Sequence, residues 1–221
     1  MADFLQSQLD AITAQTRSLV QPERLAVTEQ AIHDLLASGI ESRVLVVGAA
    51  APSFTLPDAL TGKPVRSADL LALGPVIVNF FRGRWCPYCV TELEAWQAAY
   101  PQVRERGALL VAISPQLPRQ NDFTVQQHSL TFPVLSDAGC RVAEMFGVAY
   151  TVPERMRQHL RSIMINIPFV HGDQREATWR LPVPATFVLK PAADGQATIA
   201  FAEAHADHRV RPDPADVLAA L

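Results

Sequence analysis

Two kinds of hydrophobic pattern alternate along the chain. Apolar residues at helical spacing predict helices over residues 3–19 and 23–38. Short continuous apolar runs then follow at residues 76–81, 109–113 and 132–136, and each precedes a segment of helical character. Runs of this length predict strands buried on both faces, as in a parallel sheet. Their alternation with helices predicts a doubly wound α/β sheet.

The C-terminal part of the chain changes this pattern. Apolar runs at 186–189 and 198–202 flank Ala193-Asp194-Gly195, a hairpin turn signal, so the sheet is predicted to end in an antiparallel pair. Asp213, with a proline directly after it, predicts the start of a final helix. Residues 151–181 interrupt the alternation with a cluster of arginines and apolar residues. A helix there is expected either to border the active site or to lie on the surface.

These patterns predict two parts. Residues 1–47 form an N-terminal helical extension, and residues 48–221 form one α/β domain with a central mixed sheet flanked by helices. The helices of the extension cover an exposed face, meet a partner subunit in a homodimer, or simply pack on the same domain, and the sequence leaves these alternatives open.

Composition excludes several functions. The chain has 221 residues, of which 49% are hydrophobic, enough for a substantial core. A net charge of −3 gives no electrostatic reason to expect binding to nucleic acid or an anionic membrane, and no apolar run reaches the length of a membrane span. The first residues lack the basic and apolar regions of a secretory signal. With three cysteines, the sequence predicts a protein of the reducing cytoplasm rather than a disulfide scaffold.

Cys86 and Cys89 are the main candidates for chemistry. They lie two residues apart, where a predicted strand ends and a helix begins. The free amides and the dipole at a helix start favour a thiolate over a thiol. One thiol can then attack a substrate while the other releases the product by closing a disulfide. Structural zinc needs four ligands, and the sequence has neither a second Cys-x-x-Cys nor a His-x-x-x-His. Neither a metal nor another cofactor is therefore expected.

Other candidates have competing interpretations. Arg82 and Arg84 flank the motif, and each is either a solvated charge or a group that lowers a thiol pKa or holds an anionic oxygen. Cys140 is interpreted as a small core residue rather than a resolving cysteine. The segment His205-Ala-Asp-His208 is interpreted as solvated loop rather than as a metal site.

Several stretches together resemble a known family. They resemble the peroxiredoxins and peroxiredoxin-like proteins of the AhpC/TSA family, which have a thioredoxin-like fold, and the resemblance covers about residues 48–221. The stretches are Ala51–Pro57, Phe80–Cys89, Leu135–Asp137, Phe146–Val148 and Leu181–Phe187.

The resemblance implies two different attacking cysteines. Peroxiredoxins carry Pro-x-x-x-Thr-x-x-Cys, with a glutamate three residues after the cysteine. Placing Glu92 on that glutamate makes Cys89 the attacking residue, but the threonine then falls on Cys86 and the proline on Arg82. In thioredoxins and glutaredoxins the first cysteine attacks, and Cys-Pro-Tyr-Cys is a familiar glutaredoxin motif. The sequence leaves the choice open.

The resemblance also assigns roles to three residues outside the cysteine pair. Trp85 is expected to shield the first sulfur and shape the partner surface. Pro184 matches the cis-proline that lies beside the redox pair in thioredoxins. Arg211 falls where relatives carry an arginine before the final helix, and it is a weak candidate.

We therefore expect a thiol-dependent antioxidant oxidoreductase. Its substrate is a peroxide or a disulfide, and both routes end in a Cys86–Cys89 disulfide that a thioredoxin- or glutathione-type donor reduces. The alternative is a redox-regulated binding module with little turnover. The altered threonine position and the loss of the peroxide-binding arginine, whose position falls near Pro184, motivate that alternative.

Overall fold

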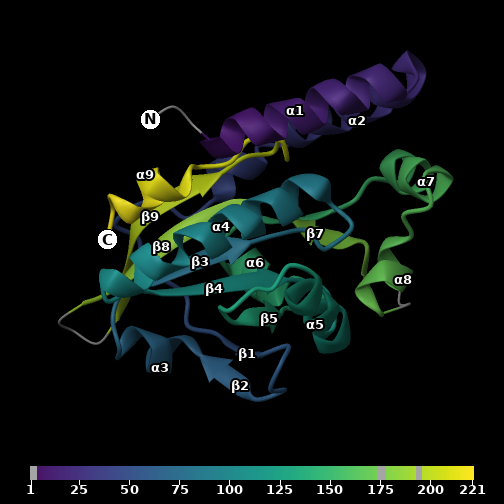
Figure 1. Cartoon of the computed structure of the whole chain (residues 1–221). Coiled ribbons are helices and arrows are strands. Elements are labelled where there is room, and N and C mark those ends of the chain that lie inside the picture. Colours follow the sequence, from purple (N-terminus) through teal and green to yellow (C-terminus); the bar gives the residue numbers. More distant parts are fainter. Residues whose placement is uncertain (1–3, 174–177, 193–195) are drawn as a thin grey trace.

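The computed structural model describes residues 4–173, 178–192 and 196–221; the predicted turn at Ala193-Asp194-Gly195 lies outside them. A five-stranded sheet in the order β5-β4-β3-β8-β9 forms its centre (Figure 1). Three of its strands are parallel, as predicted, and the other two form the predicted antiparallel pair. The strands are β3 (Val76–Phe80), β4 (Leu109–Ser114), β5 (Val134–Ser136), β8 (Ala185–Pro191) and β9 (Ala197–Ala204).

Helices cover both faces of this sheet. Alternate residues of β3 point to opposite sides, so Ile77 joins one core while Val78 and Phe80 join the other. The first core includes residues of α4 and α9, and the second includes residues of α3 and α6. Helix α5 runs beside β5. The helices are α3 (Ser67–Leu71), α4 (Pro87–Glu105), α5 (Pro118–Gln127), α6 (Arg141–Met145) and α9 (Pro214–Leu218).

Two small antiparallel pairs lie outside the central sheet. The first pairs β1 (Thr55–Pro57) with β2 (Pro64–Arg66). The second pairs β6 (Ala149–Thr151) with β7 (Arg180–Pro182), and it joins the two ends of the segment that interrupts the predicted alternation.

That inserted segment contains α7 (Glu154–Ser162) and α8 (Ile167–His171). It has a small core of its own, in which Leu160 of α7 and Ile167 of α8 pack with Trp179. Arg157 and Arg161 of α7 also lie over the Trp179 ring, with guanidinium carbons 5.5 and 4.9 Å from its centroid. The described residues of the insertion therefore pack against one another around Trp179.

The N-terminal extension consists of α1 (Phe4–Leu19), α2 (Pro22–Ala37) and the short 3₁₀ helix η1 (Ile40–Arg43). In Figure 1, α1 runs along the top of the molecule and partly covers α2, which lies behind it in this view. Leu5 and Leu9 of α1 are fully buried in the core that contains α4. Helix α2 contacts α7 of the inserted segment. The extension thus packs on the α/β domain, whereas the domain boundary at residue 47 stays a prediction.

None of the helices in the described ranges combines the length and the apolar character that crossing a lipid bilayer requires.

Candidate active site

The two cysteines lie where the sequence predicts them, between the end of β3 and the first turn of α4. Cys86 is the residue that precedes the helix, and Cys89 lies within its first turn. Gly83 shapes the connecting loop with a φ of 144°. A Cβ atom at this position would lie 2.7 Å from Trp85 Nε1, so only glycine fits without a shift.

Cys86 lines a cavity that Cys89 does not reach. Both cysteines are free thiols, and Cys86 is 1% exposed while Cys89 is 0% exposed. Cys86 lines a cavity of about 200 Å³ together with Trp85. Cys89 is deeper, and its Sγ lies 3.5 Å from the Arg82 backbone nitrogen and 3.6 Å from Arg211 Nη2. A small molecule that enters this cavity therefore meets Cys86 first.

The two thiols have opposite pKa shifts. Burial penalises a thiolate at Cys86, but a hydrogen bond with Cys89 and the charges of Arg82 and Arg211 outweigh it and lower the Cys86 pKa to about 6. At Cys89, burial and then the interactions with Cys86 raise the pKa well above the ordinary value. Cys86 is thus the thiolate at neutral pH and Cys89 the thiol that stabilises it.

Ionisation of Cys86 can be followed by ultraviolet absorbance. We expect the ultraviolet absorbance of a thiolate to appear on raising the pH, with a midpoint near pH 6. Below that pH the Cys86 thiol is protonated and unreactive, and above it the thiolate persists. Cys140 stays silent in this range because burial raises its pKa. Arg82→Gln should move the midpoint upward by removing a stabilising charge. A midpoint near pH 9 in the wild-type protein would contradict the assignment.

Arg82 and Trp85 lie against Cys86, where the sequence predicts them. The Arg82 guanidinium carbon is 4.8 Å from the centroid of the Trp85 ring, a cation–π contact. Arg82 is only 5% exposed, and its Nε atom has no hydrogen-bond partner within the described ranges. A buried N–H group without such a partner is costly. Arg82 is therefore a strong candidate for binding a negatively charged group.

A buried ion pair lies behind Cys89. Arg211 Nε is 2.6 Å from Glu92 Oε2, and both side chains are almost fully buried. Asn79 Nδ2 donates to Glu92 Oε1 at 2.7 Å and to Thr186 Oγ1 at 3.1 Å. Burial raises the Glu92 pKa to about 7, although Arg211 opposes the shift. Arg211, a weak candidate from the sequence, is thus central to the site. A buried glutamate requires such a partner, but spacing along the chain does not reveal which arginine it is.

His171 is a site residue that the sequence analysis missed. It belongs to α8 of the inserted segment and is fully buried. Its Nε2 lies 3.1 Å from Trp85 Nε1 and 3.1 Å from the Arg82 carbonyl oxygen. Burial lowers its pKa to about 3, so the ring is neutral. One nitrogen either accepts from Trp85 or donates to the carbonyl, and the tautomer selects between them. His171 thereby links the insertion to the active-site loop.

His208 lies in a loop, as expected, but it is only partly exposed rather than fully solvated. His208 lines the cavity at Cys86, and its ring meets the edge of Tyr88 with centroids 5.3 Å apart. Burial holds its pKa well below the usual value, so it is neutral. His205 instead pairs with Glu203 at 2.8 Å. Within the described residues, no group of three or more His, Cys, Asp or Glu side chains has an arrangement that suits a metal ion.

The expected cis-proline at Pro184 is wrong. All peptide bonds in the described ranges are trans, and Pro184 lines a neighbouring cavity rather than the one at Cys86. The trans form is favoured by about 0.5–1 kcal/mol unless the surroundings select the other isomer. Here extended backbone runs from β7 into β8, held by hydrogen bonds from Val183 N to Val148 O and from His205 N to Pro184 O.

Two further candidates lie away from the cysteine pair. Cys140 is fully buried in the core on the opposite face of the sheet from Cys86, so its interpretation as a core residue is confirmed. The Arg84 backbone nitrogen donates to Gln116 Oε1 at 2.9 Å, and its side chain lines neither cavity around Arg82.

The fold and the dithiol define the class of protein. A mixed five-stranded sheet flanked by helices, with two thiols at the start of α4, is a thioredoxin-like α/β fold. Residues 47–194 match the model of the AhpC/TSA family. The chain belongs to this family.

Solved structures share the fold. Peroxidoxin BcpB from Mycobacterium tuberculosis superposes with a TM-score of 0.58 at 24% identity, covering 79% of this chain and 94% of that one. A cysteine-to-serine mutant of PrxQ from Xylella fastidiosa gives a TM-score of 0.58 at 15% identity, covering 79% and 94%. At these identities the likeness concerns the fold alone.

Curated relatives match over a shorter stretch. Thiol-disulfide oxidoreductase ResA of Bacillus thuringiensis is 33% identical over 106 residues, which are 46% of this chain and 58% of ResA. Chloroplastic peroxiredoxin Q of Populus jackii is 33% identical over 101 residues, 46% of each chain. The chain thus spans about half the length of the curated relatives that it matches.

Proposed function

We propose that this protein is a thiol-dependent oxidoreductase that reduces peroxides or disulfides, with Cys86 as the attacking thiolate and Cys89 as the resolving thiol. One observation carries the proposal. The two sulfurs differ in both ionisation and access, because Cys86 has the lowered pKa and lines a cavity, whereas Cys89 has the raised pKa and lies behind it. This division of roles suits a two-thiol cycle.

In the peroxide route, the Cys86 thiolate attacks one oxygen of the O–O bond. The bond breaks, Cys86 is oxidised to a sulfenic acid, and the leaving oxygen takes a proton to become an alcohol or water. The Cys89 sulfur then attacks the Cys86 sulfur, which releases water and forms the disulfide. The charge of Arg82, which lowers the Cys86 pKa, would also stabilise the negative charge that develops on the leaving oxygen.

In the disulfide route, the Cys86 thiolate attacks one sulfur of the substrate. A mixed disulfide forms while the other half leaves as a thiolate. Cys89 then attacks the Cys86 sulfur and releases the second half. Both routes oxidise the pair by two electrons and end in the same Cys86–Cys89 disulfide.

Cys89 must lose a proton before it can attack, and Glu92 is the candidate acceptor. Its pKa of about 7 lets it accept a proton at neutral pH, and Arg211 touches both groups, with Nε on Glu92 and Nη2 beside the Cys89 sulfur. Burial still raises the Cys89 pKa during the cycle, but the contribution of the Cys86 thiolate to that shift is lost once Cys86 gives up its negative charge in the first step. Deprotonation of Cys89 then becomes easier at the stage that requires it.

The cycle closes when a cellular thiol reduces the disulfide. We place this cycle in the cytoplasm as part of the proposal, because a reducing pool of thiols is present there to regenerate the pair.

Mass spectrometry tests the proposal on the wild-type protein. One equivalent of hydrogen peroxide or of a small disulfide should convert the protein to a form that has lost two hydrogen atoms and in which Cys86 and Cys89 are linked. Dithiothreitol should restore the starting mass and sustain turnover. A redox-regulated binding module would instead react no faster than a free thiol, and that result would contradict the proposal.

A further inference from the structure

The active cysteine is covered by helices that do not belong to the central α/β fold. The 200 Å³ cavity at Cys86 is lined by Thr13 of α1, Leu25 of α2 and Met156 of α7, among others. Helices α2 and α7, which both contribute to this lining, also contact each other. With Cys86 only 1% exposed, another protein cannot bring its own sulfur to Cys86 unless these helices move. A small thiol has no such requirement.

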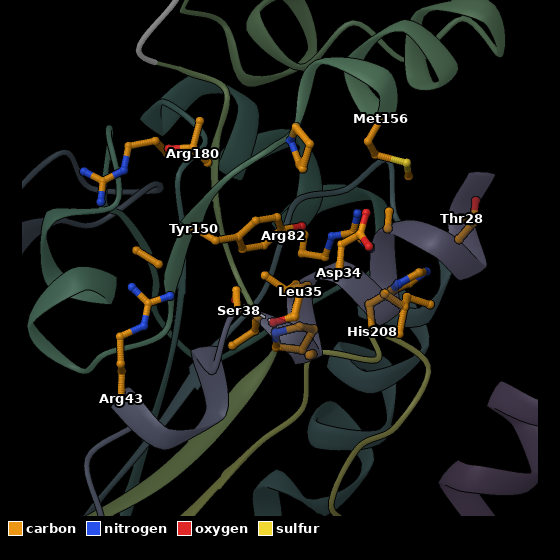
Figure 2. Close-up of a pocket in the computed structure, with 18 of the residues that line it drawn as sticks. Thr28, Asp34, Leu35, Ser38, Arg43, Arg82, Tyr150, Met156, Arg180 and His208 are labelled. Atoms are coloured by element: carbon orange, nitrogen blue, oxygen red, sulfur yellow. Dashed lines mark hydrogen bonds between the residues drawn. The ribbon is translucent and has the colours of Figure 1, made fainter. Parts of the chain in front are cut away.

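A second and larger cavity, of about 370 Å³, adjoins the first. Thr28, Arg82, Met156 and His208 line both. Figure 2 shows Arg82 and Tyr150 in the middle of this larger cavity, with His208, Met156 and Thr28 to one side and Arg43 and Arg180 to the other. A molecule whose sulfur reaches Cys86 would extend past Arg82 into this space. The volume of this larger cavity falls in the range of about 300–1,000 Å³ that is typical of small-molecule sites.

The charges in this cavity favour an anionic occupant. The buried Arg82 has no ion pair within the described ranges, and its Nε lacks a hydrogen-bond partner. At the far side, the exposed Arg43 also has no ion pair in the described part of the chain, whereas Arg180 is paired with Glu144 at 3.0 Å. Two arginines at separate points along one cavity are thus available for carboxylates. Asp34, also on the lining, offers a place for an ammonium group.

We infer that the thiol that regenerates the Cys86–Cys89 disulfide is a small, carboxylate-bearing thiol of the glutathione type, bound in the larger cavity beside Arg82 and Arg43, rather than a protein dithiol. The inference rests on the proposed function, since it concerns the second half of the same cycle. It also assigns a role to α2 and α7, which admit a small thiol while keeping protein partners from the sulfur.

The chemistry balances with two molecules of this thiol. The first, as a thiolate, attacks the Cys86 sulfur; the Cys86–Cys89 bond breaks, a mixed disulfide forms on Cys86, and Cys89 leaves and takes up a proton. The second attacks the sulfur of the bound thiol. The two small thiols leave together as their disulfide, and Cys86 is restored as the thiolate.

Rates of disulfide reduction test the inference. The wild-type protein is oxidised with one equivalent of peroxide, freed of the oxidant, and mixed with glutathione, 2-mercaptoethanol or a thioredoxin-type protein dithiol. Rate constants are compared per thiolate. Glutathione should be faster than 2-mercaptoethanol by about tenfold or more, because its carboxylates gain charge-assisted hydrogen bonds. The protein dithiol should be slower than glutathione.

Two arginine variants provide the matched comparison. In Arg43→Gln the ratio of the glutathione rate to the 2-mercaptoethanol rate should fall severalfold toward one. In Arg66→Gln, which removes an exposed arginine outside both cavities, the ratio should be unchanged.

Three outcomes overturn the inference alone: a protein dithiol that outpaces glutathione, equal rates per thiolate for the two small thiols, or an Arg43→Gln ratio that matches the wild type. If the Cys86–Cys89 disulfide never forms, the proposed function fails, and this inference fails with it.

Discussion

Cys86→Ser should lower the rate of peroxide or disulfide reduction by at least about 10³-fold, because it removes the attacking atom of a unit whose members act together. Serine keeps the shape of the side chain, but its hydroxyl does not ionise near neutral pH. The neighbouring Cys89 cannot substitute for it, since burial raises its pKa and it lines no cavity around Arg82. Initial rates and the mass of the protein after one equivalent of peroxide provide the measurement.

The Cys89→Ser variant is the matched partner of this experiment. It should still react once with the oxidant, because the Cys86 thiolate remains, although with a higher Cys86 pKa once the Cys89 thiol is gone. The reaction should then stop at a trapped sulfenic acid or mixed disulfide on Cys86. If instead the Cys86→Ser variant traps the intermediate, Cys89 is the attacking residue, as the peroxiredoxin alignment implies. Full activity of both variants would remove the dithiol from the mechanism altogether.

The Arg211→Met substitution should destabilise the protein by about 3–5 kcal/mol at neutral pH, because it leaves the fully buried Glu92 without its positive partner. Methionine keeps much of the volume of the arginine stem, so the effect is mainly electrostatic. Chemical denaturation at pH 7 measures it. Arg66→Met, which removes an exposed charge, serves as the control and should change the stability by less than about 0.5 kcal/mol.

The pH dependence of the same variant separates charge from packing. Without Arg211, burial raises the Glu92 pKa further above the unfolded value, because the charge that opposed it is gone. The folded state then holds a proton that the unfolded state releases, so stability falls as pH rises above the unfolded pKa. Adding Glu92→Gln should recover part of the loss, since the introduced amide keeps an oxygen for Asn79 without the charge. A loss below about 1 kcal/mol, or one that does not vary with pH, would contradict this account.

The sequence predicts most of the central fold because the relevant signals are local. The mainly apolar run at residues 76–81 matches the buried strand Val76–Phe80, and Asp213 caps the final helix through its Oδ1, which accepts from Ala215 N at 2.9 Å. The Cys86-x-x-Cys89 motif falls at the helix start for the same reason, because a strand, a turn and a helix follow one another within a few residues.

The pairing of β6 with β7 illustrates what such signals miss. These short strands lie about thirty residues apart, and neither has a clear pattern of its own, so only their contact with each other defines them. The same holds for His171, which reaches Trp85 across 86 positions of the chain. At Pro184 the sequence instead predicts a feature that is absent. The family resemblance implies a cis peptide bond at this position, but the bond is trans.

The amino-acid sequence by itself determines that this protein has a thioredoxin-like sheet with two cysteines at the start of a helix, because short-range patterns specify strands, turns and caps. Only the tertiary structure decides which sulfur is ionised and what can reach it. Arg82, Arg211 and Glu92 act on the thiols through space, and α2 and α7 enclose Cys86 from distant parts of the chain. Electrostatic energies and access depend on distances between atoms, which spacing along a sequence does not encode.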